Sequence, residues 1–446
     1  MAKENEEVES QKSIPASKVQ RAARFMKTGV KVGRNYIKHY ARNAVNPGTG
    51  KDLLHEDNAR DIYDSLSELK GSALKIAQMM SMDKNLLPAA YSEKFQMAQY
   101  SAPPLSYPLV VRTFRKDVGK TPEEVFDTFT RNAVNAASIG QVHQATLGDK
   151  KFAVKVQYPG VAESVTSDLK MVKPFAVNIL GLNDSDVNHY MDEVRTMLLA
   201  ETDYELELRR SREISAATSH IPHLRFPKYY PEYSSRHILT MDWLEGMHLD
   251  AFLKTNPSQE ICTQIGQAMW NFYDYQIHHM KSVHADPHPG NFILNEAGEL
   301  GIIDFGAVKE IPDEFYNKYF VLLGGDITED DERLMKIFKG LNFIYDDDSQ
   351  RDKEEIFTIL KTMVELLGRP FRRDTFDFGD DSYFREIYEF GEESAKAKAL
   401  KESKKPRGAR DGLYLNRTYF GLYSILNQLK ANIDTKSYWQ ENTFQI

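Results

Sequence analysis

The hydrophobic positions between residues 61 and 82 recur at intervals of three and four, the spacing of one face of an α-helix. This stretch, DIYDSLSELKGSALKIAQMMSM, is therefore predicted to be an amphipathic helix. Lys75 and Gln78 lie beside the apolar stripe and share one face, because residues three apart are neighbours on a helix. A lone polar pair in such a position ordinarily faces solvent. The stripe consists of Ile62, Leu66, Leu69, Ala73, Ile76, Ala77 and Met80.

Two β-rich runs follow the proline-containing break SAPPLSYP. They read ASIGQVHQATL and KFAVKVQYPG, and the short GDK connection between them predicts a β-hairpin. Helical periodicity returns from Asp192 to Ala216, where the acidic run ETDYELE lies, and a third β-rich run, RHILTMDWLEG, comes next. From Asp250 onward the pattern is mostly helical. This order predicts an α+β fold in which a small β-rich lobe with one helix precedes a larger helical lobe.

Length and composition indicate a globular protein with more than one compact unit. The chain has 446 residues, of which 41% are hydrophobic and 27% are charged, enough for two or three units with substantial cores. Its single cysteine, Cys262, excludes an internal disulfide and fits a reducing compartment. The net charge of -8 argues against nucleic acid as the main partner, because duplex binding rests on clustered cations.

Charge is segregated near the N-terminus. Residues 17 to 43 contain eight Lys or Arg and no Asp or Glu, and the basic residues recur at the helical period. This basic amphipathic helix is predicted either to contact an anionic membrane surface peripherally or to dock on an acidic part of its own chain. The sequence has no signal-peptide pattern and no apolar run long enough to span a bilayer. We therefore expect a cytoplasmic protein, peripheral to the inner face of a membrane.

The loop HADPHPGN concentrates groups that carry chemistry. His284 and His288 lie four apart, a spacing that suits a zinc site on a helix, with Asp286 as a further ligand. The two prolines of the loop forbid that helix, because proline lacks an amide donor and clashes with the preceding turn. A zinc site carried by the loop itself stays open as the weaker alternative.

Phosphoryl transfer explains this loop better. The reaction needs a carboxylate near the attacking group, oxygen ligands for Mg²⁺ and a fixed cation on the phosphates of ATP. Asp286 stands five residues before Asn291, the spacing of a kinase catalytic loop, and Asp304 of a DFG motif follows. Upstream, AVKV supplies Lys155 as the phosphate-binding cation, with a glutamate of ETDYELE as its partner. Each motif is weak alone, but four in the right order form a strong signal.

Two parts of the usual kinase pattern are missing. Where the loop over the phosphates should read G-x-G-x-x-G, the chain reads NAASIGQVH, with one glycine. Backbone amides of residues 136 to 140 are still expected to reach phosphate, although alanine restricts the backbone more than glycine does. The loop HADPHPGN also lacks the arginine of H-R-D, so a phosphate on an activation loop would lack its usual partner.

In this order, the motifs KIAQ, NAASIGQVHQA, AVKVQYPGV, ETDYELE, HADPHPGN and DFG closely resemble the UbiB/ADCK-type atypical kinase family. The match runs from about Val45 to the C-terminal RTYFGLYSILNQL, nearly the whole chain. It implies a protein-kinase-like bilobal fold with a helical N-terminal extension that packs over the active site. The chain then divides into a polar tail with the basic helix (1–45), the extension (46–125), an N-lobe (126–245) and a C-lobe (246–446).

The resemblance changes the interpretation of the helix that carries KIAQ. It implies that Lys75 and Gln78 lie at the catalytic centre, with Lys75 near Glu201 and Asp203 of the acidic run. The family's Lys-x-Gly-Gln motif has Ala77 in place of its glycine here, and the first alanine of the alanine-rich motif is replaced by an asparagine. Both departures bear on nucleotide preference and on how tightly the extension closes the site. Neither removes a charged catalytic group.

The resemblance also implies roles for the remaining charged residues. Glu207 becomes the partner of Lys155, which clamps the α- and β-phosphates, and Asp286 positions or deprotonates the attacking group. Asn291 and Asp304 hold Mg²⁺. Further contacts to the nucleotide are expected from Ala136, Ala137 and Ser138 and from the hinge residues Met241, Asp242, Trp243 and Leu244.

The preferred hypothesis is an ATP-binding, Mg²⁺-dependent atypical kinase-like ATPase that supports quinone or other prenyl-lipid metabolism at a membrane surface. The resemblance implies that the extension blocks protein phosphorylation in trans. ATP and a lipid or quinone precursor would be its partners. Two alternatives remain, a true kinase for a protein or small molecule and a non-catalytic nucleotide or lipid scaffold. The complete set of catalytic charges disfavours the scaffold.

Overall fold

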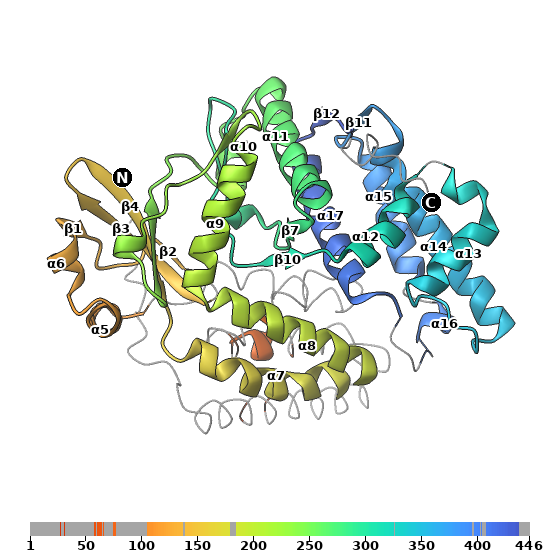
Figure 1. Cartoon of the computed structure of the whole chain (residues 1–446), viewed down its shortest axis with the longest axis horizontal. Helices are drawn as coiled ribbons and strands as arrows, with labels where there is room; N and C mark the ends of the chain where they lie inside the picture. The colour runs from red at the N-terminus through yellow and green to blue at the C-terminus, as the bar shows by residue number, and fades with distance from the viewer. Residues whose placement is uncertain are drawn as a thin grey trace, which may run out of the picture. The chain divides into compact units, whose positions relative to one another are not determined.

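The computed structural model describes residues 27, 31, 58, 60–64, 66, 75–76, 105–136, 139–178, 184–324, 326–394, 397–401, 403 and 407–436. These residues form two compact units (Figure 1). The first unit comprises the described residues up to Arg209 together with Lys228–Trp243. The second comprises Arg210–Pro227 and the chain from Leu244 onward.

An antiparallel sheet forms the centre of the first unit. Its strands run in the order β1-β3-β4-β6, and β2 pairs with β3. The predicted hairpin is confirmed, since β3 and β4 pair along their whole length around a turn at Gly148, whose φ of +58° suits glycine. The strands are β1 (Thr128–Phe129), β2 (Asn135–Ala136), β3 (Gly140–Leu147), β4 (Lys150–Gln157) and β6 (Ile238–Asp242).

One face of this sheet packs against an N-terminal helix, α5 (Tyr107–Asp117). Phe152, Val154 and Val156 alternate along β4, and all three are buried. They form one apolar cluster with Val110 and Phe114 of α5. Side chains two apart on a strand point to the same face, so this alternation fixes which residues of β4 point to the other side.

The first unit contains more helix than the single helix predicted for the β-rich lobe. Besides α5, it has α6 (Pro122–Val125), α7 (Val161–Asn178), α8 (Asp184–Glu201) and the first turns of α9 (Tyr204–Thr218). The helices α7 and α8 lie side by side (Figure 1). The helical pattern predicted from Asp192 to Ala216 is divided between two helices, α8 and α9. Asp203 interrupts it, because its carboxylate accepts a hydrogen bond from the amide of Leu206 and so caps a new helix.

The second unit is mainly helical and is built around a large aromatic core. Trp270, Phe272 and Tyr273 of α11 are buried at its centre. The helices are α10 (Leu249–Leu253), α11 (Gln259–His278), α12 (Asp313–Tyr319), α13 (Asp331–Gly340), α14 (Gln350–Gly368), α15 (Asp381–Ser394), α16 (Lys398–Lys401) and α17 (Arg410–Gln428).

Short strands in the second unit hold the loops that carry the kinase-like motifs. β8 (Phe292–Leu294) pairs antiparallel with β9 (Leu300–Ile302), and β5 (Leu224–Arg225) pairs parallel with β9. β7 (Ser282–His284) pairs antiparallel with β10 (Val308–Glu310). A further pair, β11 (Thr375–Asp377) and β12 (Asn432–Asp434), lies elsewhere in the chain.

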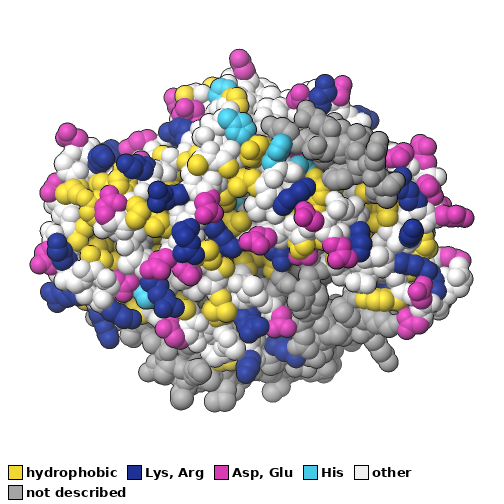
Figure 2. All heavy atoms as spheres, viewed as in Figure 1, with side chains coloured by type: hydrophobic (Ala, Val, Ile, Leu, Met, Phe, Trp, Pro, Cys, Tyr) yellow, Lys and Arg dark blue, Asp and Glu magenta, His cyan; other side chains and the backbone are white. Residues whose placement is uncertain are grey.

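The predicted basic helix of residues 17 to 43 lies outside the described residues except for Lys27 and Lys31. Both are helical and exposed. Lys31 Nζ lies 3.8 Å from Asp61 Oδ1. On the face drawn in Figure 2, the described Lys and Arg side chains are interspersed with Asp and Glu. None of the helices that the structure describes is long and apolar enough to cross a membrane.

Candidate functional site

The first unit holds a buried cation on strand β4. The Nζ of Lys155 donates to both carboxylate oxygens of Glu207 at 3.1 Å, and it lies 5.0 Å from the ring centre of Tyr204. The Lys155 side chain is 8% exposed and that of Glu207 is 0% exposed. A buried charge is tolerated only when it is paired and hydrogen-bonded, and the bidentate geometry provides both. Two of the residues predicted to act together are thus held together within one unit.

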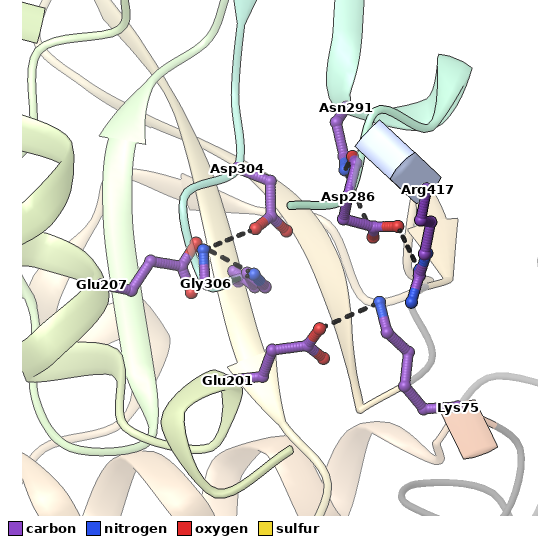
Figure 3. A network of polar contacts seen from close by, with 9 residues as sticks. Lys75, Glu201, Glu207, Asp286, Asn291, Asp304, Gly306 and Arg417 are labelled. Atoms are coloured by element: carbon purple, nitrogen blue, oxygen red, sulfur yellow. Dashed lines mark hydrogen bonds and ion pairs between the residues drawn. The ribbon is translucent and has the colours of Figure 1, made fainter. Parts of the chain in front are cut away.

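The acidic run ETDYELE distributes its charges over separate tasks. Asp203 caps α9, and Glu207 lies one turn into that helix, where it meets Lys155. Glu201 ends α8 and lies 3.0 Å from the Nζ of Lys75 (Figure 3). The Lys75 side chain is 12% exposed, so it does not face solvent as a lone polar residue on a helix ordinarily does. Gln78, the other residue of this motif, lies outside the described residues.

The single glycine of NAASIGQVH has a packing role in the first unit. A Cβ on Gly140 would lie 2.7 Å from the hydroxyl of Tyr204 and 2.8 Å from the carbonyl oxygen of Val156. Only glycine fits between these neighbours without a shift. Ala136 lies in β2 and pairs with Gln141, whereas Ala137 and Ser138 lie outside the described residues. The nucleotide contacts predicted for these three residues therefore stay predictions.

The predicted hinge lies at the end of β6. Met241 is buried in the sheet, and Asp242 accepts hydrogen bonds from the Tyr230 hydroxyl at 2.7 Å and the Lys228 amide at 3.1 Å. The amides of Asp242 and Trp243 donate to the carbonyls of Lys228 and Lys151. These two amides are therefore used inside the first unit. Adenine recognition by residues 241 to 244 stays a prediction.

The second unit holds the loop of Asp286. The amide of Ala285 donates to the carbonyl of Ala307, which continues the β7–β10 pairing to the edge of the loop. The Asn291 side-chain amide donates to the Asp286 carbonyl at 2.8 Å and lies 3.5 Å from its carboxylate (Figure 3). The hydrogen bond to the carbonyl closes a turn from Asp286 to Asn291, which accounts for the spacing of five residues between them.

Asn291 and Asp304 come together because of the β8–β9 register. Phe292 pairs with Ile302, and the amide of Ile303 donates to the carbonyl of Asn291 at 3.1 Å. Asp304 follows directly, and its Oδ1 accepts a hydrogen bond from the amide of Gly306 at 2.9 Å. Since the amide nitrogen of Asn291 is directed to Asp286, its oxygen is the group left to bind a cation. An amide oxygen and a carboxylate are hard ligands, and this donor set fits Mg²⁺.

The histidines of the loop serve its structure. His284 is buried, and its Nδ1 lies 3.1 Å from the hydroxyl of Tyr273. His288 Nδ1 accepts a hydrogen bond from the amide of Gly290 at 3.0 Å. Burial, reinforced by the charge of Asp286, raises the pKa of Tyr273 well above its usual value, so this phenol stays neutral. The described residues contain no group of three or more His, Cys, Asp or Glu arranged to hold a metal ion, so the zinc alternative gains no support.

The sequence analysis missed one charged residue of this site. Arg417 of α17 places its Nη2 at 3.1 Å from Asp286 Oδ1, and its side chain is 13% exposed (Figure 3). A signal was present, because Arg417 is the only charged residue between Leu413 and Leu429. A charged side chain within a stretch of helix rich in apolar residues needs a partner. Its partner, Asp286, lies far away in the sequence, so the local pattern around Arg417 does not identify it.

A comparison with protein families decides the assignment. The ABC1 atypical kinase-like domain matches residues 97–338, more than half of the chain. The chain belongs to the ABC1 atypical kinase-like family. The resemblance to the UbiB/ADCK-type family is thereby confirmed, as is the predicted α+β, kinase-like fold class.

Relatives of this ABC1-family chain include two proteins named as atypical kinases. It is 30% identical to the mitochondrial atypical kinase COQ8 of Saccharomyces cerevisiae, over 83% of this chain and 75% of that protein. It is 26% identical to the mitochondrial atypical kinase COQ8B of Danio rerio, over 96% of this chain and 68% of that protein.

A solved structure from Mycobacterium tuberculosis is similar to the ABC1-family chain. It is described as the complex of Rv3197 with erythromycin, and it aligns with a TM-score of 0.56 at 25% sequence identity. The alignment covers 86% of this chain and 95% of that one. The similarity therefore extends over most of both chains.

Proposed function

We propose that this ABC1-family chain binds ATP with Mg²⁺ and hydrolyses it in support of prenyl-lipid or quinone metabolism. The observation that carries the proposal is the buried Lys155–Glu207 pair. A lysine on a central strand, held by both oxygens of a helix carboxylate, is the arrangement that kinases use to bind the α- and β-phosphates. A purely structural protein would gain little from it, because apolar residues of similar volume stabilise a core at least as well.

The second unit supplies the other groups that the reaction needs. Asp286 would orient or deprotonate the attacking water, and Asn291 and Asp304 would hold Mg²⁺, which would supply positive charge to the phosphates. The hydrogen bond from the Asn291 side chain to the Asp286 carbonyl holds these two residues of the loop next to each other. The hydrogen bond from the Gly306 amide to Oδ1 of Asp304 restricts the orientation of this carboxylate.

The Lys75–Glu201 ion pair supports hydrolysis over transfer to a protein. The pair joins Lys75 to the end of α8, within the first unit. We propose that this contact holds the extension in a position that excludes protein acceptors. Water, being small, still reaches the phosphates.

The lipid context rests on the relatives and on the basic segment. Both named COQ8 relatives are mitochondrial proteins, and kinase-like relatives of this kind imply ATP as a ligand. We propose a membrane-peripheral role in which residues 17 to 43 contact anionic lipid. Deleting residues 1 to 45 would then abolish binding to anionic liposomes, and unchanged binding would contradict that role.

The experiment that tests the function is ATP hydrolysis by the purified chain and by Asp304→Asn. Each is assayed with and without anionic liposomes and a phenolic mimic of a quinone precursor. We expect hydrolysis that requires Mg²⁺, rises with liposomes and is lost in Asp304→Asn. Labelled phosphate on an added protein or small molecule would favour a true kinase. Binding of ATP without turnover under any condition would favour a scaffold.

A further inference from the structure

The last long helix of the second unit, α17, contacts the loop of Asp286 through a charged side chain. The guanidinium of Arg417 lies 3.1 Å from Oδ1 of Asp286, and the two side chains are 13% and 11% exposed. The other carboxylate oxygen, Oδ2, lies 3.5 Å from the amide nitrogen of Asn291. The carboxylate therefore lies between one donor from its own loop and one from a helix distant in the sequence, and each donor restricts its rotation.

Close backbone packing holds α17 against the same loop. A Cβ on Gly421 would lie 2.4 Å from Cγ and 3.2 Å from the carbonyl oxygen of Pro287, the residue after Asp286. Gly421 lies four residues after Arg417, and residues four apart share one face of a helix. The same face of α17 thus places the arginine on the carboxylate and the glycine on the proline that follows it.

A second contact joins α17 to the segment after DFG. Lys309 of β10 lies 2.9 Å from the carboxylate of Asp411 and 5.2 Å from the ring centre of Tyr414. Lys309 lies on β10, which follows Asp304, and β10 pairs with β7, which precedes Asp286; α17 therefore contacts the loop after β7 and the strand after DFG. The helix thus fixes both of these segments within one unit.

The charge on Arg417 has a chemical use beyond packing. The guanidinium is planar and directs its N–H groups in fixed directions, so its hydrogen bond to Oδ1 restricts the orientation of the Asp286 carboxylate. The loop lacks the arginine of H-R-D, so its sequence supplies no cation of its own at that place.

We propose that Arg417 is a positioning residue for Asp286, which makes α17 part of the catalytic apparatus. The inference rests on the proposed function, because it assigns Arg417 its role through Asp286. Arg417 holds the carboxylate toward the attacking group and does not itself contact the reacting atoms.

The test measures Mg²⁺-dependent ATP hydrolysis in the presence of anionic liposomes for the wild type, Asp286→Asn, Arg417→Met, Arg417→Lys and the double variant Asp286→Asn/Arg417→Met. We expect Arg417→Met to lower kcat by about tenfold to a hundredfold, because misplacing a reacting group by about 1 Å costs that much, and to leave KM for ATP unchanged. Arg417→Lys restores part of kcat, since it keeps the charge without the fork. In the double variant the two losses do not add, because both act through one carboxylate.

The matched control is Arg407→Met, which breaks an arginine–carboxylate pair of similar burial in the same unit. Arg407 donates to both oxygens of Asp348 at 2.8 and 2.9 Å, and these side chains are 12% and 7% exposed. We expect this variant to lose stability and to keep its kcat. If Arg417→Met is unfolded at the assay temperature, Arg417→Gln takes its place, because glutamine keeps a donor without the charge.

Each outcome separates the inference from the proposed function. Activity in the wild type that is lost in Asp286→Asn supports the function whatever Arg417 does. The inference is overturned if the neutral Arg417 variant retains wild-type kcat, if its loss is no larger than that of Arg407→Met, or if the double variant shows additive losses. An inactive wild type overturns the function and the inference together.

Discussion

The ammonium group of Lys75 lies 3.0 Å from Glu201, six residues before the glutamate that holds Lys155 in the same unit. One short acidic run therefore supplies the partners of two buried lysines. Asp203 lies between these glutamates and caps α9, so the break between α8 and α9 sends them to different lysines. Three of the four acidic residues in ETDYELE thus have specific contacts.

Variants of the Lys155–Glu207 pair are expected to affect the free energy of unfolding and ATP hydrolysis differently. Lys155→Met or Glu207→Gln leaves one buried charge without its partner, and each is expected to lower the free energy of unfolding by about 3 to 5 kcal/mol. The double variant removes both charges and is expected to regain most of that stability while remaining inactive. Urea denaturation and ATP hydrolysis measure the two effects. Recovery of activity in the double variant would rule out the proposed role of Lys155.

The Lys75–Glu201 pair is expected to control which acceptor takes the phosphate. Lys75→Met should cost about 1 to 3 kcal/mol, because the buried Glu201 loses a charged partner, and should raise phosphate transfer to protein. Exchanging the charges, Lys75→Glu with Glu201→Lys, should restore the wild-type ratio of hydrolysis to transfer. Arg195→Met is the control, since Arg195 and Asp192 form an exposed pair 3.8 Å apart. If Lys75→Met and the wild type show the same ratio of hydrolysis to transfer, the pair does not control the acceptor.

Gly140→Ala is expected to destabilise the first unit by about 1 to 3 kcal/mol, as overpacking does. The new methyl would meet the carbonyl oxygen of Val156 at 2.8 Å, and a backbone atom in a sheet cannot move aside. Gly340→Ala in α13 is the control, because a Cβ there meets nothing within 4 Å and alanine favours helix. Thermal unfolding of both variants provides the comparison. Equal melting temperatures would show that the packing at Gly140 is looser than the distances indicate.

Stability should fall in mild acid because two histidines are buried in neutral form. Burial lowers the pKa of His143 in the first unit to about 4 and that of His278 in the second to about 3. Below pH 6.5 these histidines bind protons in the unfolded chain but stay neutral in the folded chain. The free energy of unfolding therefore rises with pH between the folded pKa values and 6.5. Each histidine is expected to cost about 2 kcal/mol between pH 7.5 and pH 5.

His143→Gln tests the contribution of one of these histidines. Glutamine keeps a polar group near the partners of His143, which are Gln141 and the Thr130 carbonyl. Chemical denaturation at pH 7.5 and pH 5 should give a smaller difference for the variant than for the wild type. An unchanged difference would mean that His143 does not titrate in this range.

Much of the site was predictable because its motifs are local. The spacing from Asp286 to Asn291 is set by one turn, and the hairpin that carries Lys155 is encoded by two β-rich runs with a short link. The missing parts depend on contacts between distant segments. Three contacts of this kind are Arg417 with Asp286, Gly140 with Tyr204 and Gly421 with Pro287. In each contact, the local sequence around one residue does not indicate the other.

The break between α8 and α9 shows a different limit. Hydrophobic periodicity continues across it, so the pattern alone predicts one helix. The capping carboxylate of Asp203 decides otherwise. A side chain that competes for a backbone amide outweighs a weak preference for continued helix.

The most direct test of the central claim is calorimetric titration of ATP into the purified chain, with and without Mg²⁺. The Lys155→Met/Glu207→Gln variant is compared, because its expected stability allows a folded control. We predict binding in the wild type that strengthens with Mg²⁺ and is lost in the variant. Equal binding in both proteins, or binding that ignores Mg²⁺, would contradict the assignment of these residues to an ATP site.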